Sequence, residues 1–500
     1  MQKYRHILSI ILLIAALAYT LWFVFAGFGN HQDPLYWLYK YEHLEGGWLA
    51  TGTLLTGGTI VRLFGAELLP LRIAGWLCVV VAIALPYCLL LTKEQRRENL
   101  YWLALAYAYM GYGAFQEFSP GTLSVLLLSV LWVTQSPIVL GLAVAARFPN
   151  ILALLVLIPI WKKRNLWNIP IAAVTAGVVY LVGHFFISPA VTDPMMSSHD
   201  FWPMITKLWN GGGKLIGYLF ISIAVVLIGQ KQPAQFNNKK SKIIAILKPY
   251  LVGLALWYFA FMTIKTYQWY NADLTLLVCA LCLVIALATK EKTLYIGAAI
   301  LAVATLGTDT AWLKLFPAVL CLLPVAITHY KPLQIRYLWL IMLVFGTIVV
   351  NNMIINSVGQ SNLKRATTFS TISPYTHIAI RPAEEERLAQ YITDYHQTKI
   401  TNPETPIMAI GQEMHLMRAV TGCDAARYNE FWSNIYDSVY TAKYREIIEA
   451  EHPIVFCSYS PQFKTKPEYK DAESRLENML RDEGYSEIQR TKYKYIIYEP

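Results

Sequence analysis

The sequence predicts a polytopic α-helical membrane protein that ends in a small soluble α/β domain. Of its 500 residues, 56% are hydrophobic and only 15% are charged. Soluble globular chains carry about 25% charged residues and lack repeated apolar runs of about 20 residues. Apolar runs of that length recur up to residue 356, after which the sequence becomes polar. We therefore place the membrane part at residues 1–356 and the soluble domain at residues 357–500.

The net charge of +10 is divided unevenly between these two parts. Residues 1–356 hold 25 Lys and Arg against 12 Asp and Glu, whereas residues 357–500 hold 17 against 20. The basic excess lies in the loops between apolar runs, where positive charge sets the orientation of a membrane protein. It therefore reports on membrane topology and argues against a nucleic-acid partner.

The first apolar run, residues 7–28, follows a short basic leader with Lys3 and Arg5. Because no small-residue cleavage site follows it, we expect a retained first helix and not a removed signal peptide. Basic clusters then recur along the membrane part, and the positive-inside rule places them all in the cytoplasm. These clusters are Lys3 with Arg5, 93–99, 161–165, 231–242, 289–292 and 329–336.

An outer turn must fall between each pair of basic clusters. Candidate turns are residues 29–68, 115–121, 147–150, 190–212, 265–273 and 307–310. A further inner turn at 134–137 is needed because the stretch 121–161 is too long for one pass. The two passes beside Arg147 are then short and broken, as membrane proteins tolerate where helices line a cavity. The result is thirteen passes, with the N-terminus cytoplasmic and the tail outside.

The soluble domain alternates helical and strand patterns, which predicts an α/β arrangement. Helices are expected at 384–397, 435–450 and 471–482, the last ending before Gly484, and strands at 406–410, 453–457 and 494–499. We find no glycine-rich nucleotide motif and no His/Cys ligand spacing in this domain. Two of its cysteines, Cys423 and Cys457, can form a disulfide if the domain faces an oxidising compartment, and the sequence leaves their state open.

The first outer loop, residues 29–68, has an internal order. Residues 33–45 have helical spacing with interleaved aromatic side chains, and Gly-Gly-Trp at 46–48 interrupts that pattern. A second, moderately apolar segment follows at 49–65, and an Arg-containing segment then opens the next membrane helix. We therefore expect two juxtamembrane helices in this loop, at the outer face.

This order resembles the GT-C class of glycosyltransferases, which use polyprenyl-phosphate-linked sugar donors and include the protein O-mannosyltransferases and the lipid A aminoarabinose transferase. The matching motifs are Asp33 after the first helix, IVRLFG (60–65), LRIAGWL (71–77), AARFPNILALLVLIPI (145–160) and IMAIGQEMHLMRAVTGCDAARY (408–428). The resemblance covers the whole chain in architecture. It implies a bacterial cytoplasmic-membrane enzyme that inverts the sugar as it transfers it, on the outer face, to a glycan, lipid or protein acceptor.

The resemblance implies a catalytic role for Asp33, a carboxylate that water and a lipid phosphate can both reach. In the GT-C class this carboxylate acts as general base on the acceptor hydroxyl or helps to hold it, and such catalysis contributes about 10² to 10⁴ in rate. The alternative is a solvated carboxylate or helix cap, because Asp33-Pro34 is also a good helix start.

The phosphate leaving group needs cationic partners, and four outer-side cations near helix ends can bind it. Each of them can instead be a snorkelling side chain at the membrane interface. These cations are Arg147, Lys265, Arg72 and Arg62.

Four further residues are candidates for binding the substrate or a divalent cation. Glu117 lies between two phenylalanines at the outer end of the third expected pass, where an acid is costly unless it is paired or hydrated. It can hold a sugar hydroxyl, help to bind a divalent cation or pair with one of the arginines. Asp193, His199 and Asp200 can ligate a metal or simply lie at a loop surface.

The expected function is therefore a glycosyltransferase with a polyprenyl-phosphate sugar donor. The alternative is a transporter or flippase of lipid-linked sugars, which needs no base and which paired broken helices in both halves would favour. We find one broken pair, near Arg147, without a counterpart. A ligase of lipid-linked sugars differs mainly in the size of its donor and stays open.

Overall fold

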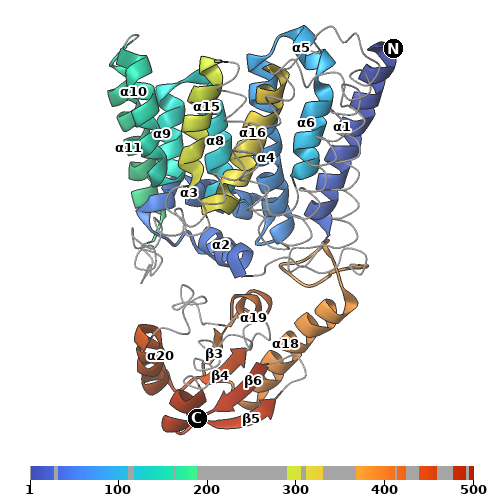
Figure 1. Ribbon diagram of the computed structural model, residues 1–500. Helices are drawn as coiled ribbons and strands as arrows, with labels where there is room; N and C mark the ends of the chain where they lie inside the picture. Colours follow the sequence, from blue (N-terminus) through green and yellow to red (C-terminus); the bar gives the residue numbers. More distant parts are fainter. Residues whose placement is uncertain are drawn as a thin grey trace, which may run out of the picture.

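The computed structural model describes residues 2–26, 32–110, 118–162, 165–188, 290–305, 311–329, 367–411, 414–423, 438–458, 477–490 and 495–500. Within these ranges the chain forms a bundle of helices and, at one end of the bundle, a smaller unit of helices and strands (Figure 1). The passes expected between 212 and 289 and between 336 and 356 lie outside the described residues, as does the boundary at 356. The count of thirteen passes and that boundary therefore stay predictions.

Each expected pass that falls on described residues is helical. Among the residues that the structure describes, three helices are long and apolar enough to span a membrane: α1 (Gln2–Phe25), in which residues 6–25 form the apolar part, α4 (Leu68–Leu90) and α11 (Asn168–Phe186). The other passes are shorter: α6 (Leu100–Tyr109), α8 (Pro120–Thr134), α9 (Pro137–Ala146), α10 (Leu154–Lys162), α15 (Lys292–Ala302) and α16 (Ala311–His329). Helix α1 packs against α6, α4 against α8 and α9 against α11.

A turn at 134–137 is confirmed, its cytoplasmic side stays a prediction, and local chemistry explains both ends of α8. Ser119 and Thr122 cap its start reciprocally, each hydroxyl accepting the other residue's backbone N–H at 3.4 Å and 2.9 Å, and Pro120 occupies the first helical position. The helix ends at Gln135, which has a left-handed backbone with φ of 51°, and Pro137 then opens α9.

Hydrogen bonds bring several of the basic turns to one end of the bundle. The indole of Trp161 donates to the carbonyl of Gln135 at 3.0 Å, and the indole of Trp132 donates to the carbonyl of Thr293 at 2.8 Å. Helix α5 (Lys93–Glu98) lies at this same end, near the N-terminus (Figure 1). We call it the α5 end and the opposite end, which faces the tail, the α2 end.

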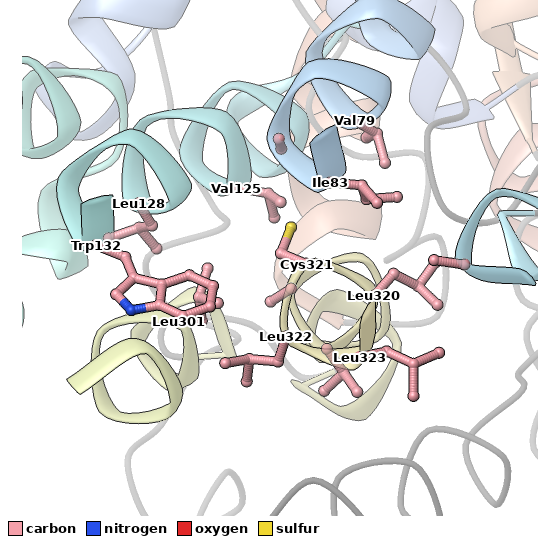
Figure 2. Packing of buried hydrophobic residues seen from close by; sticks show 14 of the residues in the cluster. Val79, Ile83, Val125, Leu128, Trp132, Leu301, Leu320, Cys321, Leu322 and Leu323 are labelled. Atoms are coloured by element: carbon pink, nitrogen blue, oxygen red, sulfur yellow. The ribbon is translucent and has the colours of Figure 1, made fainter. Parts of the chain in front are cut away.

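The bundle core is built from large apolar side chains that meet between four helices. Figure 2 shows Leu128 and Trp132 of α8 beside Leu301 of α15, with Cys321 of α16 pointing toward α8 and α4. Cys321 is fully buried, where cysteine packs as a small apolar side chain. The ring of Trp132 leaves no room for a Cβ at Gly297 of α15, so glycine is required at this crossing.

The tail contains a four-stranded mixed sheet with the order β3-β4-β6-β5. The strands are β3 (Ile407–Gly411), β4 (Ile454–Ser458), β5 (Ser486–Arg490) and β6 (Tyr495–Glu499). The described helices of the tail include α18 (Pro382–Thr401), α19 (Met414–Thr421) and α20 (Ser438–Glu451). Only β3 and β4 pair in parallel. Three strands lie within a residue or so of the expected positions, whereas β5 was not expected. Residues 477–482 are helical and end before Gly484, whose φ is 86°.

Alternate residues of β3 enter two different buried clusters, so this strand is covered on both faces. Ile407 and Ala409 belong to one cluster, and Met408 and Ile410 belong to the other. A short antiparallel pair, β1 (Thr368–Phe369) with β2 (Ala379–Ile380), leads into the domain. Cys423 and Cys457 are buried thiols in different clusters, so the disulfide between them is not formed.

Candidate functional site

The first outer loop and the tail form one packed unit at the α2 end (Figure 1). The backbone N–H of Leu68 donates to the carbonyl of Pro374 at 3.0 Å, and the hydroxyl of Thr376 donates to the carboxylate of Glu67 at 3.1 Å. One buried cluster also contains apolar side chains from both parts. From the loop and the start of α4 it includes Leu35, Leu38, Tyr41, Leu54, Leu68 and Leu71, and from the tail Leu388, Ile407, Leu416, Phe456 and Ile497.

The loop folds into the two expected helices, α2 (Gln32–His43) and α3 (Thr51–Phe64), with a short 3-10 turn, η1 (Trp48–Ala50), between them. Glycine lets α2 and α3 approach closely, because a Cβ at Gly57 would lie 2.6 Å from Cγ of Tyr41 and closer still to other ring atoms. The Tyr41 hydroxyl donates to the carbonyl of Phe118 at 3.0 Å. Helix α2 is therefore fixed both to α3 and to the start of α8.

Asp33, the predicted base, lies in the first turn of α2. The structure describes this helix but not the surroundings of the Asp33 side chain, so its role stays a prediction. The far end of α2 is fixed independently: the backbone N–H of Ser188 donates to the carbonyl of Leu44 at 2.8 Å, and the N–H of Gly46 donates to the carbonyl of Ser188 at 3.1 Å. The C-terminal end of the helix that carries Asp33 is thus held by the bundle.

Two of the predicted phosphate-binding cations are turned inward. Arg72 lies about one turn into α4 and is 0% exposed. Arg147 stands at the break between α9 and the 3-10 helix η2 (Phe148–Ala153), half-buried, with a guanidinium nitrogen that donates to the carbonyl of Ala304 at 2.7 Å. Both positions lie toward the α2 end.

The break beside Arg147 has a specific polar lining. Asn150 is 0% exposed, and its amide nitrogen donates to the carbonyl of Ala143 at 2.8 Å and to the hydroxyl of Ser124 at 2.7 Å. Thr53 of α3 donates to the carbonyl of Ala146 at 2.8 Å. The carbonyls freed where α9 stops are therefore bonded, and the expectation of a short, broken pair of passes is confirmed.

Arg62 behaves differently from the other two arginines. It is exposed on α3, beside Leu63 and Phe64, which are 71% and 65% exposed. A long cationic side chain among exposed apolar neighbours fits an anchor at the membrane interface. The sequence left open whether Arg62 binds the phosphate or anchors α3 at the membrane interface. Its exposed apolar neighbours favour the anchor.

The remaining candidates, Glu117, Lys265, Asp193, His199 and Asp200, lie outside the described residues. Within the described ranges, no group of three or more His, Cys, Asp and Glu residues could hold a metal ion. The divalent cation therefore stays an open expectation that depends on those candidates.

A polar cluster between α2 and α19 was missed by sequence reasoning. The guanidinium carbon of Arg418, on α19, lies 3.4 Å from the ring centroid of Tyr39, on α2. The Tyr39 hydroxyl donates to the carboxylate of Glu45 at 3.1 Å, and the ring of Tyr36 meets that of His415 edge-on at 5.8 Å. Burial raises the pKa of Tyr39 to about 12 and lowers the pKa of Arg418 to about 10.

A signal for this cluster does exist in the sequence. Tyr36, Tyr39, Lys40 and His43 recur at helical spacing and so share one face of α2. An aromatic and cationic face on a juxtamembrane helix is a plausible docking surface, but the partner helix lies almost at the other end of the chain. Nothing in the local pattern of either helix identifies the other.

No protein-family model matches the chain, and no curated protein matches it. Among solved structures, the chain is similar to ArnT. The structure is described as "Crystal Structure of ArnT from Cupriavidus metallidurans bound to Undecaprenyl phosphate", and the sequences are 11% identical over 98% of this chain and 97% of that chain. The TM-score of this comparison is 0.42.

The α2 end thus combines features that suit chemistry on a lipid phosphate. One helix carries an acid in its first turn, Arg72 is buried near the start of α4, Arg147 is half-buried at the end of α9, and the tail packs onto the first outer loop. A buried cation is costly unless an anion or hydrogen-bond acceptors compensate it. A phosphate that enters from the membrane boundary is an anion of the right charge for such a place.

Proposed function

We propose that this protein is an integral membrane glycosyltransferase that moves a sugar from a polyprenyl-phosphate carrier to an acceptor at the α2 end. The observation that supports it most directly is the placement of two arginines at helix ends beside the first outer loop: Arg72 at the start of α4, which packs on α2, and Arg147 at the end of α9, which packs on α3. A membrane anchor would turn its charge outward, as Arg62 does. Cations that are turned inward fit a negatively charged substrate group.

In the proposed reaction, Asp33 accepts the proton of an acceptor hydroxyl as that oxygen attacks the anomeric carbon of the sugar. The bond between the anomeric carbon and the phosphate oxygen breaks, and its electron pair leaves with the polyprenyl phosphate. Attack opposite the leaving group inverts the anomeric centre. Arg147 and Arg72, with Lys265 as a further candidate, stabilise the negative charge that develops on the phosphate.

The topology that we propose places the α2 end outside the cytoplasmic membrane of a bacterium, with the α5 end in the cytoplasm. The basic sequence of α5 supports this orientation. The tail, which packs on the first outer loop, would then contact the acceptor, whether that is a glycan, a lipid or a protein.

A transfer assay tests the function. Purified full-length protein is given a panel of radiolabelled polyprenyl-phosphate sugars together with membrane and glycan extracts, and label is followed into lipid, glycan and protein fractions. We expect one donor to lose its label to one fraction. A transporter would leave every donor intact, so label that stays on the carrier across the panel would refute the proposal.

Asp33→Asn tests the mechanism within the same assay. The change keeps the size of the side chain and removes its basicity, so transfer should fall by about two orders of magnitude or more. Asn caps a helix about as well as Asp, and thermal stability in detergent should therefore stay near wild type. The control is Asp482→Asn, at a carboxylate that is 70% exposed in the tail. Normal transfer by folded Asp33→Asn protein would exclude Asp33 as the base.

A further inference from the structure

The Arg418 guanidinium is buried at the junction of the tail and the first outer loop. Its side chain comes from α19, its exposure is 9%, and it stacks on the ring of Tyr39 of α2. Stacking uses the flat face of the guanidinium and leaves its N–H groups, which point outward in the plane, available for hydrogen bonds. The contact with Tyr39 therefore orients the donors of Arg418 but does not satisfy them.

Those donors have an incomplete set of partners in the part of the chain that the structure describes. The nitrogen Nη1 of Arg418 is buried there and has no hydrogen-bond partner. The nearby carboxylates act on Arg418 through space, and that of Glu45 accepts the Tyr39 hydroxyl. Among the described residues, the ion pairs of the tail involve other arginines, Arg381 and Arg445.

A buried guanidinium with an unused donor is unfavourable by itself. Burial lowers the pKa of Arg418 to about 10, so the group still carries its charge at neutral pH. A buried charge without a bonded partner is strongly unfavourable, and a bound oxyanion removes much of that penalty. Phosphate suits the arrangement because the planar edge of a guanidinium binds two of its oxygens at once.

The place of Arg418 indicates where such an anion comes from. Tyr39 follows Asp33 by six residues on the same helix, about 9 Å along its axis. The junction also lies where the helical bundle meets the soluble domain, which is the level of lipid head groups. We propose that Arg418, held by Tyr39, binds the phosphate group of a lipid at the junction of α2 and α19.

This inference deepens the proposed function, on which it rests for the expectation that the lipid is the polyprenyl-phosphate carrier. A phospholipid head group presents the same chemistry, so the test includes both. Full-length protein in a phosphate-free detergent is titrated with undecaprenyl phosphate, undecaprenol or phosphatidylglycerol, and bound lipid is counted by native mass spectrometry. The assay contains neither a sugar donor nor an acceptor and measures lipid binding alone. Its result can therefore be interpreted even if the protein does not transfer sugar.

We expect wild-type protein to bind undecaprenyl phosphate at least tenfold more tightly than undecaprenol. Arg418→Gln should weaken the binding of the phosphate lipid by about ten- to a hundredfold, since a charge-assisted contact is lost. Arg418→Lys keeps the positive charge but loses the planar guanidinium with its paired donors. Its affinity for undecaprenyl phosphate should lie between those of wild type and Arg418→Gln. The matched control is Arg445→Gln, because Arg445 already pairs with Glu483 at 3.0 Å.

Hydrogen exchange of α19 in the wild-type protein supplies a readout that does not depend on any variant. Undecaprenyl phosphate should slow exchange at residues 414–421, and undecaprenol should not. Comparable binding and protection by phosphatidylglycerol would assign the site to head groups in general, and a preference for undecaprenyl phosphate would assign it to the carrier. Equal binding by wild type and Arg418→Gln, or equal protection by undecaprenol, would overturn the proposal.

Discussion

Replacing Gly57 with Ala should separate α2 from α3. A methyl group at this position would lie 2.6 Å from Cγ of Tyr41, and Tyr41 is 0% exposed with its hydroxyl bonded to the carbonyl of Phe118 at 3.0 Å. The ring therefore has no free space into which it can rotate. Either it shifts and loses that hydrogen bond, or the two helices move apart.

The expected magnitude follows from three opposing effects. Ala in place of Gly favours the helix by about 1 kcal/mol. Overpacking of a filled site costs about 1–3 kcal/mol, and an unsatisfied buried polar group costs about 1–3 kcal/mol. The clash outweighs the gain in helix propensity, and the net loss of stability is about 1–5 kcal/mol.

Gly177→Ala is the matched control, since nothing lies within 4 Å of a Cβ at Gly177 of α11. This variant should be neutral or more stable by up to about 1 kcal/mol. Thermal unfolding of both variants in detergent, followed by tryptophan fluorescence, ranks them directly. Gly57→Ala should also transfer sugar more slowly than wild type at temperatures at which the variant is still folded, because a shift of about 1 Å in α2 displaces Asp33. A Gly57→Ala protein as stable as Gly177→Ala would refute this reasoning.

Three further predictions concern the same end of the molecule and its orientation. A reporter fused after Pro500 should report an external position and one inserted in 231–242 a cytoplasmic position; a cytoplasmic C-terminus would contradict the thirteen-pass topology. Arg147→Ala should lower catalytic efficiency about ten- to a hundredfold through a lost contact to phosphate, whereas Arg62→Ala should not. Wild-type kinetics in both variants would show that both arginines only anchor their helices at the membrane interface. Asn150→Ala should destabilise the protein by about 1–3 kcal/mol in thermal unfolding, since Ser124 and the carbonyl of Ala143 lose a partner; an unchanged melting temperature would mean that water replaces the amide.

The sequence was informative about the bundle because lipid imposes a simple rule on it. Long apolar runs must be helical in a membrane, and basic clusters mark their cytoplasmic ends. The break near Arg147 was readable for the same reason, since the available length could not hold two full passes. The strands β3, β4 and β6 were found because apolar residues run through them without a helical period.

Strand β5 was missed because its sequence, SEIQR, is mostly polar and charged. It pairs only with β6 and lies at the edge of the sheet, and its register is interrupted between Glu487 and Gln489. Edge strands commonly carry charge, which prevents further pairing and removes the apolar signal by which strands are recognised.

The orientation of the candidate cations could not be predicted either. Arg62 and Arg72 both stand near helix ends at the membrane boundary, and the sequence around each is similarly apolar. Which of them faces inward depends on how α3, which carries Arg62, and α4, which carries Arg72, are rotated in the bundle, and close contacts such as that of Gly57 with Tyr41 constrain that packing. The contact between Tyr39 and Arg418 depends likewise on tertiary packing and has no local signature.

The buried cluster shared by the first outer loop and the tail sets an order of events during synthesis. Residues 35–41 leave the ribosome long before residues 388–497, with which they share a core. The apolar face of α2 therefore stays uncovered until residues 388–497 have been made and have folded onto it. A chain that is terminated early would leave this face bare, which is the kind of surface that membrane quality-control proteases detect.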